Sequence, residues 1–379
     1  MPLKILQIAD VHLGRLFASF GHYAERMQQH LEDAFIRSIT AALEHKVDAV
    51  LIAGDLFDSN APDAKAVDLA RQHFELLSSA KIPAFVVAGT HDCSGAFGSI
   101  YESEKFLGLT PLTSAVLENP ITINKESPLH IYGISARPGV HVDLSSMAKR
   151  PGPGIHVGML HATVSYGHEN VPLRDIPVTT EQLSSLGLDY VALGHIHSYK
   201  PIMSADRMVA AYSGSLVPLS FKNLGIGGAL MIQFDGARIS ATQIPVGSIN
   251  IRVESLEAAE DSIDELSKKL INYSEPGTVA KICITGIRSE PLDIPAILQK
   301  VSPHFEYLVI EDKTNLLSDY MIREASSAPT VRGIFIRLML EAAQNAKAAG
   351  DSKRLALIQE ALREGLTAFE RNRRAEDSI

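Results

Sequence analysis

The stretch VDAVLIAGD, Val47 to Asp55, decides the fold, because its apolar run has the length of a buried strand and ends in a glycine and a carboxylate. A near-continuous apolar run is typical of a strand that is covered on both faces of its sheet. Apolar residues at helical spacing precede the stretch within residues 29–46 and follow it within residues 66–80. Strand and helix therefore alternate around it, which predicts an α/β fold.

Two more strands flank these helices. The stretch KILQIAD, Lys4 to Asp10, precedes the first helix, and IPAFVVAG, Ile82 to Gly89, follows the second. This strand–helix–strand–helix–strand order predicts a parallel sheet, and ligands of such sheets lie just outside the carboxyl ends of the strands. Polar side chains stand at those ends, namely Asp10, Asp55 and His91.

Further strands follow later in the first 250 residues. IHVGMLH (155–161) and DYVALGH (189–195) are apolar runs that again end in histidine. RMVAAYSGS (207–215) and GGALMIQFDG (227–236) follow, and we expect them to form antiparallel sheet that closes the domain near Asn250.

The composition is that of a globular protein with more than one domain. The chain has 379 residues, 46% of them hydrophobic and 21% charged, and one core rarely grows to this size. Two cysteines give no disulfide framework, and no apolar run reaches the length of a membrane span. A net charge of −9 excludes a broadly basic nucleic-acid coat protein, but not a nuclease whose metal ions reverse the charge locally. We expect a cytoplasmic protein without a membrane partner.

We expect three parts along the chain. Residues 1–250 form the first domain, and residues 251–313 predict a small α/β domain from their strand and helix order. Residues 314–379 predict a linker and a helical hairpin. The stripe of the first hairpin helix, which either packs inside the hairpin or binds a partner, consists of Val331, Ile334, Phe335, Leu338 and Ala342.

Five strand ends of the first domain carry side chains that can bind metal or move protons. Carboxylate oxygens and imidazole nitrogens together suit manganese, iron or zinc, and this set is larger than one ion needs. A central carboxylate, Asp55, could bridge two ions. The candidates are Asp10, His12, Asp55, Thr90, His91, Asp92, His161, His195 and His197.

The order of these motifs resembles that of the calcineurin-like metallophosphoesterases. D-x-H, G-D, G-x-H-D, H and G-H-x-H follow one another as ADVHLG, AGDLFD, AGTHD, MLHA and GHIH. The blocks are most similar to those of SbcD-type DNA repair nucleases, and the likeness extends from Leu3 to about Asn250. It implies a sandwich of two mixed β-sheets flanked by helices, with residues 251–313 as a capping domain and the C-terminal helices as a partner-binding region.

The resemblance also implies roles for the candidate residues. It implies two divalent ions, with manganese expected and iron, zinc or magnesium as alternatives. The first ion would be held by Asp10, His12, Asp55 and His197. The second would be held by Asp55, His161, His195 and the residue at position 90. His91 would be the catalytic histidine at the scissile phosphate, with Asp92 either orienting its imidazole or forming a local turn.

Position 90 departs from the family pattern. The family has asparagine there, whose amide oxygen binds the second ion, whereas this chain has Thr90. A hydroxyl is a shorter and weaker ligand than an amide carbonyl. Three interpretations follow: Thr90 binds the ion weakly, the second ion is exchangeable, or the nuclease activity is lost while the fold is kept.

The resemblance implies a metal-dependent DNA exonuclease or endonuclease in DNA repair, acting as the nuclease subunit beside an SMC-like (SbcC-type) ABC ATPase. It also implies a homodimer formed by the catalytic domain. Two alternatives stay open at this point: a phosphoesterase of small-molecule phosphodiesters, and a non-catalytic scaffold with a degraded second metal site.

Overall fold

The computed structural model describes residues 2–95, 98–135, 137, 142–165, 176–236, 238–258, 261–288, 290–316 and 326–376. The chain divides into two compact units, Met1–Ile251 and Arg252–Ile379. The three-part division expected from the sequence stays a prediction.

The first unit contains a six-stranded mixed sheet. Strands β1 to β4 run parallel, β13 pairs antiparallel with β1, and β14 pairs antiparallel with β13. Their parallel part matches the strand and helix alternation around Val47–Asp55, because each crossover helix returns the chain to the same end of the sheet. In sheet order the strands are β14 (Arg238–Pro245), β13 (Gly228–Asp235), β1 (Leu3–Ile8), β2 (Ala49–Ala53), β3 (Ala84–Val87) and β4 (Leu109–Leu112).

A second six-stranded mixed sheet packs against the first. In sheet order it consists of β11 (Lys200–Ser204), β12 (Arg207–Tyr212), β10 (Tyr190–Gly194), β7 (Ile155–His161), β6 (Leu129–Gly133) and β5 (Ile121–Ile123). The short strands β8 (Thr163–Val164) and β9 (Pro177–Val178) pair separately. One apolar core joins the two sheets and draws residues from both, such as Leu51 and Phe85 from the first and Val157 and Met159 from the second.

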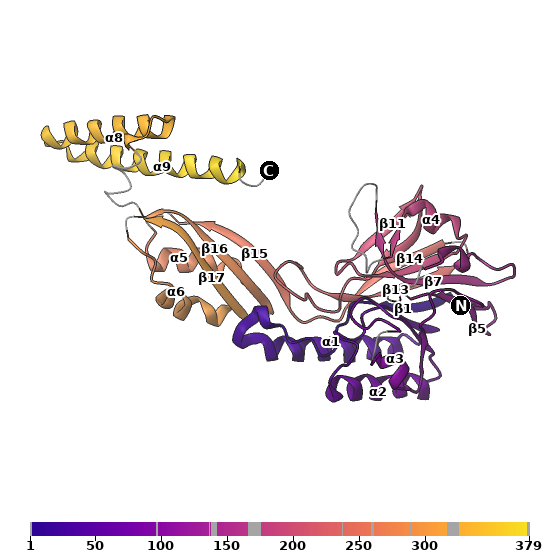
Figure 1. Ribbon diagram of the computed structural model, residues 1–379. Helices are drawn as coiled ribbons and strands as arrows, with labels where there is room; N and C mark the ends of the chain where they lie inside the picture. Colours follow the sequence, from indigo (N-terminus) through magenta and orange to yellow (C-terminus); the bar gives the residue numbers. More distant parts are fainter. Residues whose placement is uncertain are drawn as a thin grey trace. The chain divides into compact units, whose positions relative to one another are not determined.

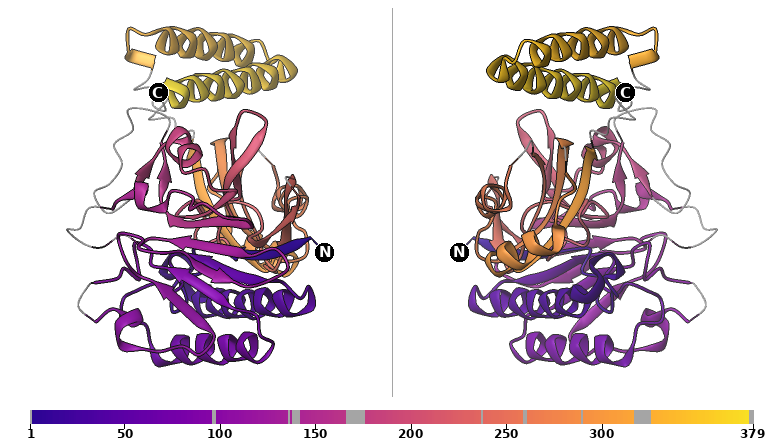
Figure 2. Two further views of the ribbon diagram at one scale, coloured as in Figure 1. Left: turned by 90° about the vertical axis from the view of Figure 1, so that its right-hand side faces the viewer. Right: turned by 90° about the vertical axis from the view of Figure 1, so that its left-hand side faces the viewer.

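Helices cover the other face of the first sheet. In Figure 1, α1 (Ala24–Glu44) and α2 (Ala64–Ser79) lie side by side along that sheet, and both views of Figure 2 show the same layer. Asp63 caps α2 by accepting a hydrogen bond from the Ala66 N–H. The short helices of this unit are η1 (Ala18–Tyr23), α3 (Ile100–Ser103), η2 (Leu144–Met147) and α4 (Thr180–Ser185).

The second unit begins with a three-stranded sheet in the order β15-β16-β17. Strands β15 (Asn250–Glu257), β16 (Thr278–Arg288) and β17 (Tyr307–Leu316) alternate along the chain with α5 (Ile263–Ile271) and α6 (Ile294–Val301), followed by η3 (Ser302–His304). Leu266 and Leu270 of α5 and Ile297 of α6 pack on buried residues of β16. The amphipathic pattern of these two helices thus accounts for their packing.

A helical hairpin, α8 (Val331–Ala348) and α9 (Ser352–Glu376), ends the described chain. Its turn uses Gly350 at φ 69°, a conformation that suits glycine. The apolar contact between the helices is made by Ile336 with Leu362 and Leu366. Three residues of the stripe expected from the sequence face outward instead: the exposed fractions are 75% for Val331, 48% for Ile334 and 60% for Leu338.

The expected sandwich of two mixed sheets flanked by helices is confirmed. The stretches 207–215 and 227–236, expected to form antiparallel sheet, do pair antiparallel with neighbouring strands, but they lie in different sheets. Strand β12 pairs with β10 and β11 in the second sheet, whereas β13 pairs with β1 and β14 in the first. Among the described residues, no helix is long and apolar enough to cross a membrane.

The orientation of α8 gives a first prediction. Replacement of Ile336, which is 1% exposed, by alanine should increase amide hydrogen exchange throughout α8 and α9, because a buried Ile→Ala change costs about 2–5 kcal/mol. The matched change Leu338→Ala, at an exposed position of the same helix, should leave the exchange nearly unchanged. Equal effects of the two changes would contradict the observed orientation of the helix.

Candidate metal centre

The candidate residues gather where the carboxyl ends of both sheets meet. Asp10 and Asp55 follow β1 and β2, Thr90 follows β3, His161 ends β7, and His195 follows β10. Parallel strands bring their carboxyl ends to one edge, so residues far apart in the sequence become neighbours. Each sheet therefore supplies one half of the centre.

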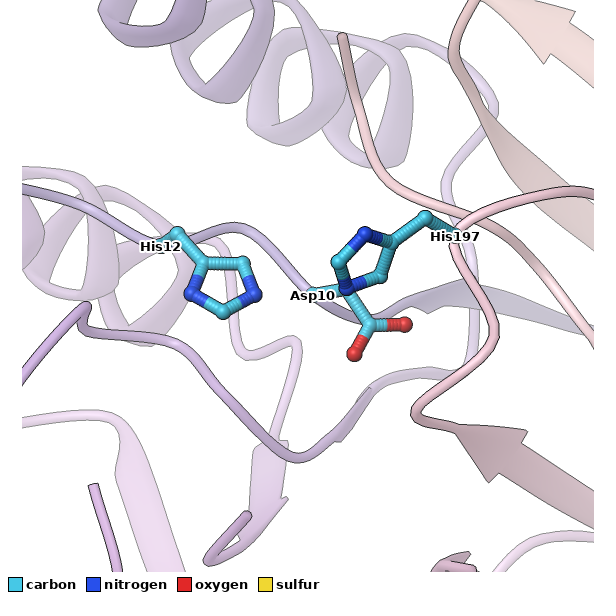
Figure 3. A group of neighbouring side chains, drawn as sticks. All are labelled: Asp10, His12 and His197. Atoms are coloured by element: carbon cyan, nitrogen blue, oxygen red, sulfur yellow. The ribbon is translucent and has the colours of Figure 1, made fainter. Parts of the chain in front are cut away.

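Asp10, His12 and His197 form the first group of possible ligands. Their ligand atoms all lie within 4.8 Å of one another, and Figure 3 shows the Asp10 carboxylate close to both imidazole rings. Asp10 and His12 are buried, while His197 is half-buried. The Asp10 carboxylate also accepts the His195 N–H, with distances of 3.0 and 3.1 Å to its two oxygens, and so joins the two sheets.

Asp10, Asp55 and His161 form a second group, again within 4.8 Å. The Oδ2 atom of Asp55 lies 3.7 Å from His12 Nε2 and 3.4 Å from His161 Nε2. One carboxylate oxygen thus lies between imidazole nitrogens that belong to the two sheets. This is the position that a bridging ligand of a two-ion centre would occupy.

The unpaired ring nitrogens fit a metal ion. His161 Nδ1 lies 3.0 Å from the Ala53 carbonyl, and His12 Nδ1 lies 3.0 Å from Asp58 Oδ1. Because a carbonyl or carboxylate oxygen only accepts, each Nδ1 carries the proton and each Nε2 presents its lone pair. Both Nε2 atoms are buried and have no hydrogen-bond partner in the structure. A divalent cation would satisfy both, and the second nitrogen of each ring is held as metal-binding histidines usually are.

The backbone is strained at this centre. Asp10, His12, Asp55 and His195 have positive φ angles of 51°, 55°, 50° and 104°. Such conformations cost about 1–3 kcal/mol for residues with a side chain and persist where the surroundings enforce them. These positive φ angles turn the chain directly after each strand, at the residues that contribute side chains to the centre.

Two glycines allow the segments of the centre to approach one another closely. At Gly89 a Cβ atom would lie 2.1 Å from Asp55 Oδ1, and at Gly54, which has φ +93°, it would lie 2.3 Å from His161 Nδ1. Both distances are shorter than any real contact, so only glycine fits. The Gly-Asp and Gly-x-His-Asp motifs therefore place glycine where the carboxylate and the imidazole must lie close together.

The buried carboxyl groups repel one another. Burial, together with the neighbouring Asp55 carboxylate, raises the pKa of Asp10 well above its usual range. Burial also acts to raise the pKa of Asp55, but His161 and His12 outweigh it and hold that pKa below its usual range. Asp55 thus loses its proton more readily than Asp10, and a bound cation would favour loss of the Asp10 proton.

Burial has the opposite effect on the imidazoles. It lowers the pKa of His161, and it lowers the pKa of His197 to about 4 with a further contribution from His12. Both rings are therefore neutral near pH 7. Neutral imidazole is the form that binds metal, so neither ring must first lose a proton.

Thr90 lies at the expected bridging oxygen. Its Oγ1 donates to Asp55 Oδ2 over 3.4 Å, a weak hydrogen bond. The hydroxyl therefore faces the centre, next to the oxygen that lies between His12 and His161. Whether it also binds an ion stays a prediction.

His91 is the most exposed histidine of the centre, with 45% of its side chain accessible. Its ring packs edge-on against His12 at 4.6 Å between centroids. Its backbone N–H donates to Asp55 Oδ1 over 2.8 Å, which fixes the segment on the candidate bridging carboxylate. The ring can thus meet a substrate while its backbone is anchored.

Of the two roles expected for Asp92, the structure supports the local one and not the orientation of His91. The Asp92 carboxylate is fully buried and accepts from the Gly89 N–H, the Phe57 N–H and the Tyr101 hydroxyl. With these partners it braces the loops after β2 and β3 and does not contact the His91 ring. Burial, with the Asp55 charge, raises the pKa of Asp92 to about 6.

Asp58 takes the role that was expected of Asp92. Its carbonyl oxygen lies 3.1 Å from His91 Nδ1, and its carboxylate contacts His12 Nδ1 at 3.0 Å and Arg15 at 2.9 Å. The Arg15 guanidinium is therefore paired with Asp58. The only signal for Asp58 is its place three residues after Asp55, and that signal does not distinguish a loop brace from a partner of histidine.

Comparison with known proteins agrees with this arrangement. The sequence model of the calcineurin-like phosphoesterase family matches residues 3–199, slightly more than half of the chain. The match includes the strand ends up to and including His195 and His197.

Three curated relatives are similar to the chain. The uncharacterized metallophosphoesterase YhaO of Bacillus subtilis is 29% identical over 63% of this chain and 59% of its own length. The DNA double-strand break repair protein Mre11 of Sulfurisphaera tokodaii is 30% identical over 56% of this chain and 53% of its own. Mre11 of Saccharolobus solfataricus is 28% identical over 56% and 54%. The chain thus matches between half and two thirds of each relative's length.

The raised pKa of Asp10 predicts proton release on metal binding. A carboxyl group with a raised pKa keeps its proton to a higher pH than usual, and a cation bound to Asp10 displaces that proton. Mn²⁺ affinity should therefore fall as the pH is lowered through the range in which Asp10 takes up its proton. Calorimetric titration in two buffers of different ionisation enthalpy measures the released protons. Asp10→Asn should remove this release, and a wild type without release would contradict the assignment.

The contacts of Asp58 predict that it supports the centre. Asp58→Asn should lower Mn²⁺ affinity about 10–100-fold, as is usual when the carboxylate behind a metal-binding histidine is changed. Asp68→Asn is the matched control, because Asp68 is an exposed carboxylate on α2 whose partner is Arg71. Equal affinities for Asp58→Asn and the wild type would show that Asp58 does not orient His12.

Proposed function

This chain belongs to the calcineurin-like phosphoesterase family, and we propose that it is a metal-dependent phosphodiesterase that cleaves DNA. One observation carries the metal-dependent part of the proposal. Asp55 Oδ2 lies between the unpaired Nε2 atoms of His12 and His161, 3.7 and 3.4 Å away. A carboxylate in this position can bridge two divalent ions.

We assign the residues to two ions as the family pattern implies. Asp10, His12 and His197 with Asp55 would hold one ion, and Asp55 with His161, His195 and Thr90 would hold the other. Bound ions of this kind supply an activated water and stabilise the charge on the phosphate oxygens. Manganese suits the mixed oxygen and nitrogen donors, and iron, zinc or magnesium are alternatives.

His91 would serve as the general acid. Its Nδ1 faces the Asp58 carbonyl at 3.1 Å, and because a carbonyl only accepts, the proton is held on Nδ1. When the ring also carries a proton on Nε2, as an imidazolium, that nitrogen can give its proton to the leaving oxygen of a phosphodiester while Nδ1 keeps its own. The exposure of this ring, beside buried ligands, fits a residue that meets the substrate.

DNA as the substrate is supported by the relatives. Two of them carry the name DNA double-strand break repair protein Mre11. The chain's net charge of −9 leaves little electrostatic attraction for DNA away from the metal ions. A partner subunit would therefore supply much of the DNA-binding surface.

We further propose that the hairpin binds that partner, an SMC-like ATPase of the SbcC type. Val331, Ile334 and Leu338 recur at helical spacing on α8 and are 75%, 48% and 60% exposed, while Ile336 packs on α9. An exposed apolar face of this kind fits a helix of a coiled coil. A homodimer of the catalytic domain and a role in DNA repair belong to the same proposal.

A specific observation favours an alternative. Thr90 stands 3.4 Å from the bridging oxygen, where a hydroxyl gives weaker metal binding than an amide carbonyl. A weak second site would suit a phosphoesterase of small phosphodiesters, or a scaffold that has lost catalysis. The first alternative differs from the nuclease in the substrate that is cleaved, and the second cleaves none.

DNA cleavage with Mn²⁺ tests the proposal. Wild-type protein should cut linear or hairpin DNA, and His91→Ala should lower the rate at least about 100-fold with Mn²⁺ binding retained, because general acids contribute about 10²–10⁴-fold. Thr90→Asn should raise the affinity for the more weakly bound ion.

The small diester bis-p-nitrophenyl phosphate serves as the second substrate. Hydrolysis of this diester or of a cyclic nucleotide without DNA cleavage would favour the small-molecule alternative. Absence of cleavage of every substrate, with metal bound, would favour the scaffold. Unchanged DNA cleavage by His91→Ala would overturn its catalytic role.

A further inference from the structure

A buried amide lies between the two sheets, just below the metal centre. Gln7 of β1 is 0% exposed and precedes Asp10 by three residues. Its Nε2 donates to the Leu193 carbonyl over 3.1 Å and to the Ala211 carbonyl over 2.9 Å. Its Oε1 accepts the Tyr190 hydroxyl over 2.6 Å. Both donors and the acceptor of this side chain are thus used across the sheet interface.

The partners of Gln7 stand on the strands that carry the second half of the centre. Leu193 of β10 precedes His195 by two residues. Ala211 lies on β12, which is followed by Gly214. Gly214 packs against the segment of His197, because a Cβ atom at Gly214 would lie 3.0 Å from the His197 carbonyl oxygen. The amide therefore ties the chain before Asp10 to the chain segments that present His195 and His197.

The described residues around Gln7 hold the two sheets together by apolar contacts and not by hydrogen bonds of this kind. The other inward-facing residues between the sheets are mostly apolar, such as Ile5, Leu51 and Met159. Apolar contacts are not directional and tolerate small displacements, whereas hydrogen bonds have preferred lengths and angles. Burying an amide costs free energy unless all its donors and acceptors are hydrogen-bonded. The presence of Gln7 between the sheets therefore indicates that it selects one arrangement of the two sheets.

We propose that Gln7 is a positioning residue for the metal centre. By binding β10 and β12 to β1 it aligns the half that carries His195 and His197 with the half that carries Asp10 and His12. Gln7 contacts neither an ion nor a substrate and acts through these side chains. The inference rests on the proposed metal centre and is independent of which phosphodiester is cleaved.

A role in stability alone predicts a different outcome. Loss of Gln7 leaves the Leu193 and Ala211 carbonyls buried without this partner, which lowers stability under either interpretation. Only a positioning role also weakens metal binding once the protein is folded. Metal affinity of the folded protein therefore separates the two interpretations.

The experiment compares Gln7→Leu and Tyr190→Phe with the control Ile5→Ala. Ile5 lies on the same strand, two residues away and on the same inward face, but contributes apolar contacts only. Circular dichroism and thermal unfolding establish folding, and calorimetry measures the Kd and the number of Mn²⁺ ions bound. Gln7→Leu should weaken Mn²⁺ binding roughly 10–100-fold, as is usual for residues behind metal ligands. Tyr190→Phe, which removes one of the three hydrogen bonds, should weaken it less.

Ile5→Ala should lower the unfolding temperature while its Mn²⁺ affinity stays within about twofold of the wild type, because distant, unconnected sites contribute separately. Wild-type affinity in Gln7→Leu, or an equal loss of affinity in Ile5→Ala, would overturn the proposal. If Gln7→Leu does not fold, Tyr190→Phe decides, and wild-type affinity in that variant would also overturn it. DNA cleavage is not a readout here, so failure of the nuclease proposal and failure of this one give different results.

Discussion

The rest of the centre depends on the contacts that the buried Asp55 carboxylate makes. Its Oδ1 accepts the His91 N–H over 2.8 Å, and its Oδ2 faces the Nε2 atoms of His12 and His161. It thereby connects the segment after β3 to the first sheet and to the second sheet. A buried charge needs such partners, because an isolated carboxylate away from water is strongly disfavoured. Glycine at position 89 and strained backbone at Asp55 itself are the structural conditions that allow them.

Much of the fold could be predicted from sequence, because the strands of the first sheet are apolar runs separated by amphipathic helices. The ligand positions followed from the same pattern, since parallel strands bring their carboxyl ends together. The partners of β12 and β13 could not be predicted. The partner of a strand is chosen by packing against residues far away in the sequence. The residues within RMVAAYSGS and GGALMIQFDG therefore do not indicate which sheet each strand joins.

The finer details depend on loop geometry that the sequence does not show. Asp58 and Asp92 both lie within four residues of a candidate ligand, yet Asp58 contacts the imidazoles and Asp92 braces the loops. The phase of α8 is similar: Val331, Ile334 and Leu338 form a good stripe, but packing uses the face of Ile336. A helix with apolar residues on two faces has two possible orientations, and the partner helix α9 decides between them.

A two-ion centre bridged by Asp55 is tested by counting the Mn²⁺ ions bound per chain and recording their electron paramagnetic resonance spectrum. Two ions per chain with a spin-coupled signal are expected, because a shared carboxylate would hold them within about 3.5–4 Å of each other. Asp55→Asn should abolish the coupling. A single ion per chain at saturation, or two ions with uncoupled signals, would rule out a bridged centre.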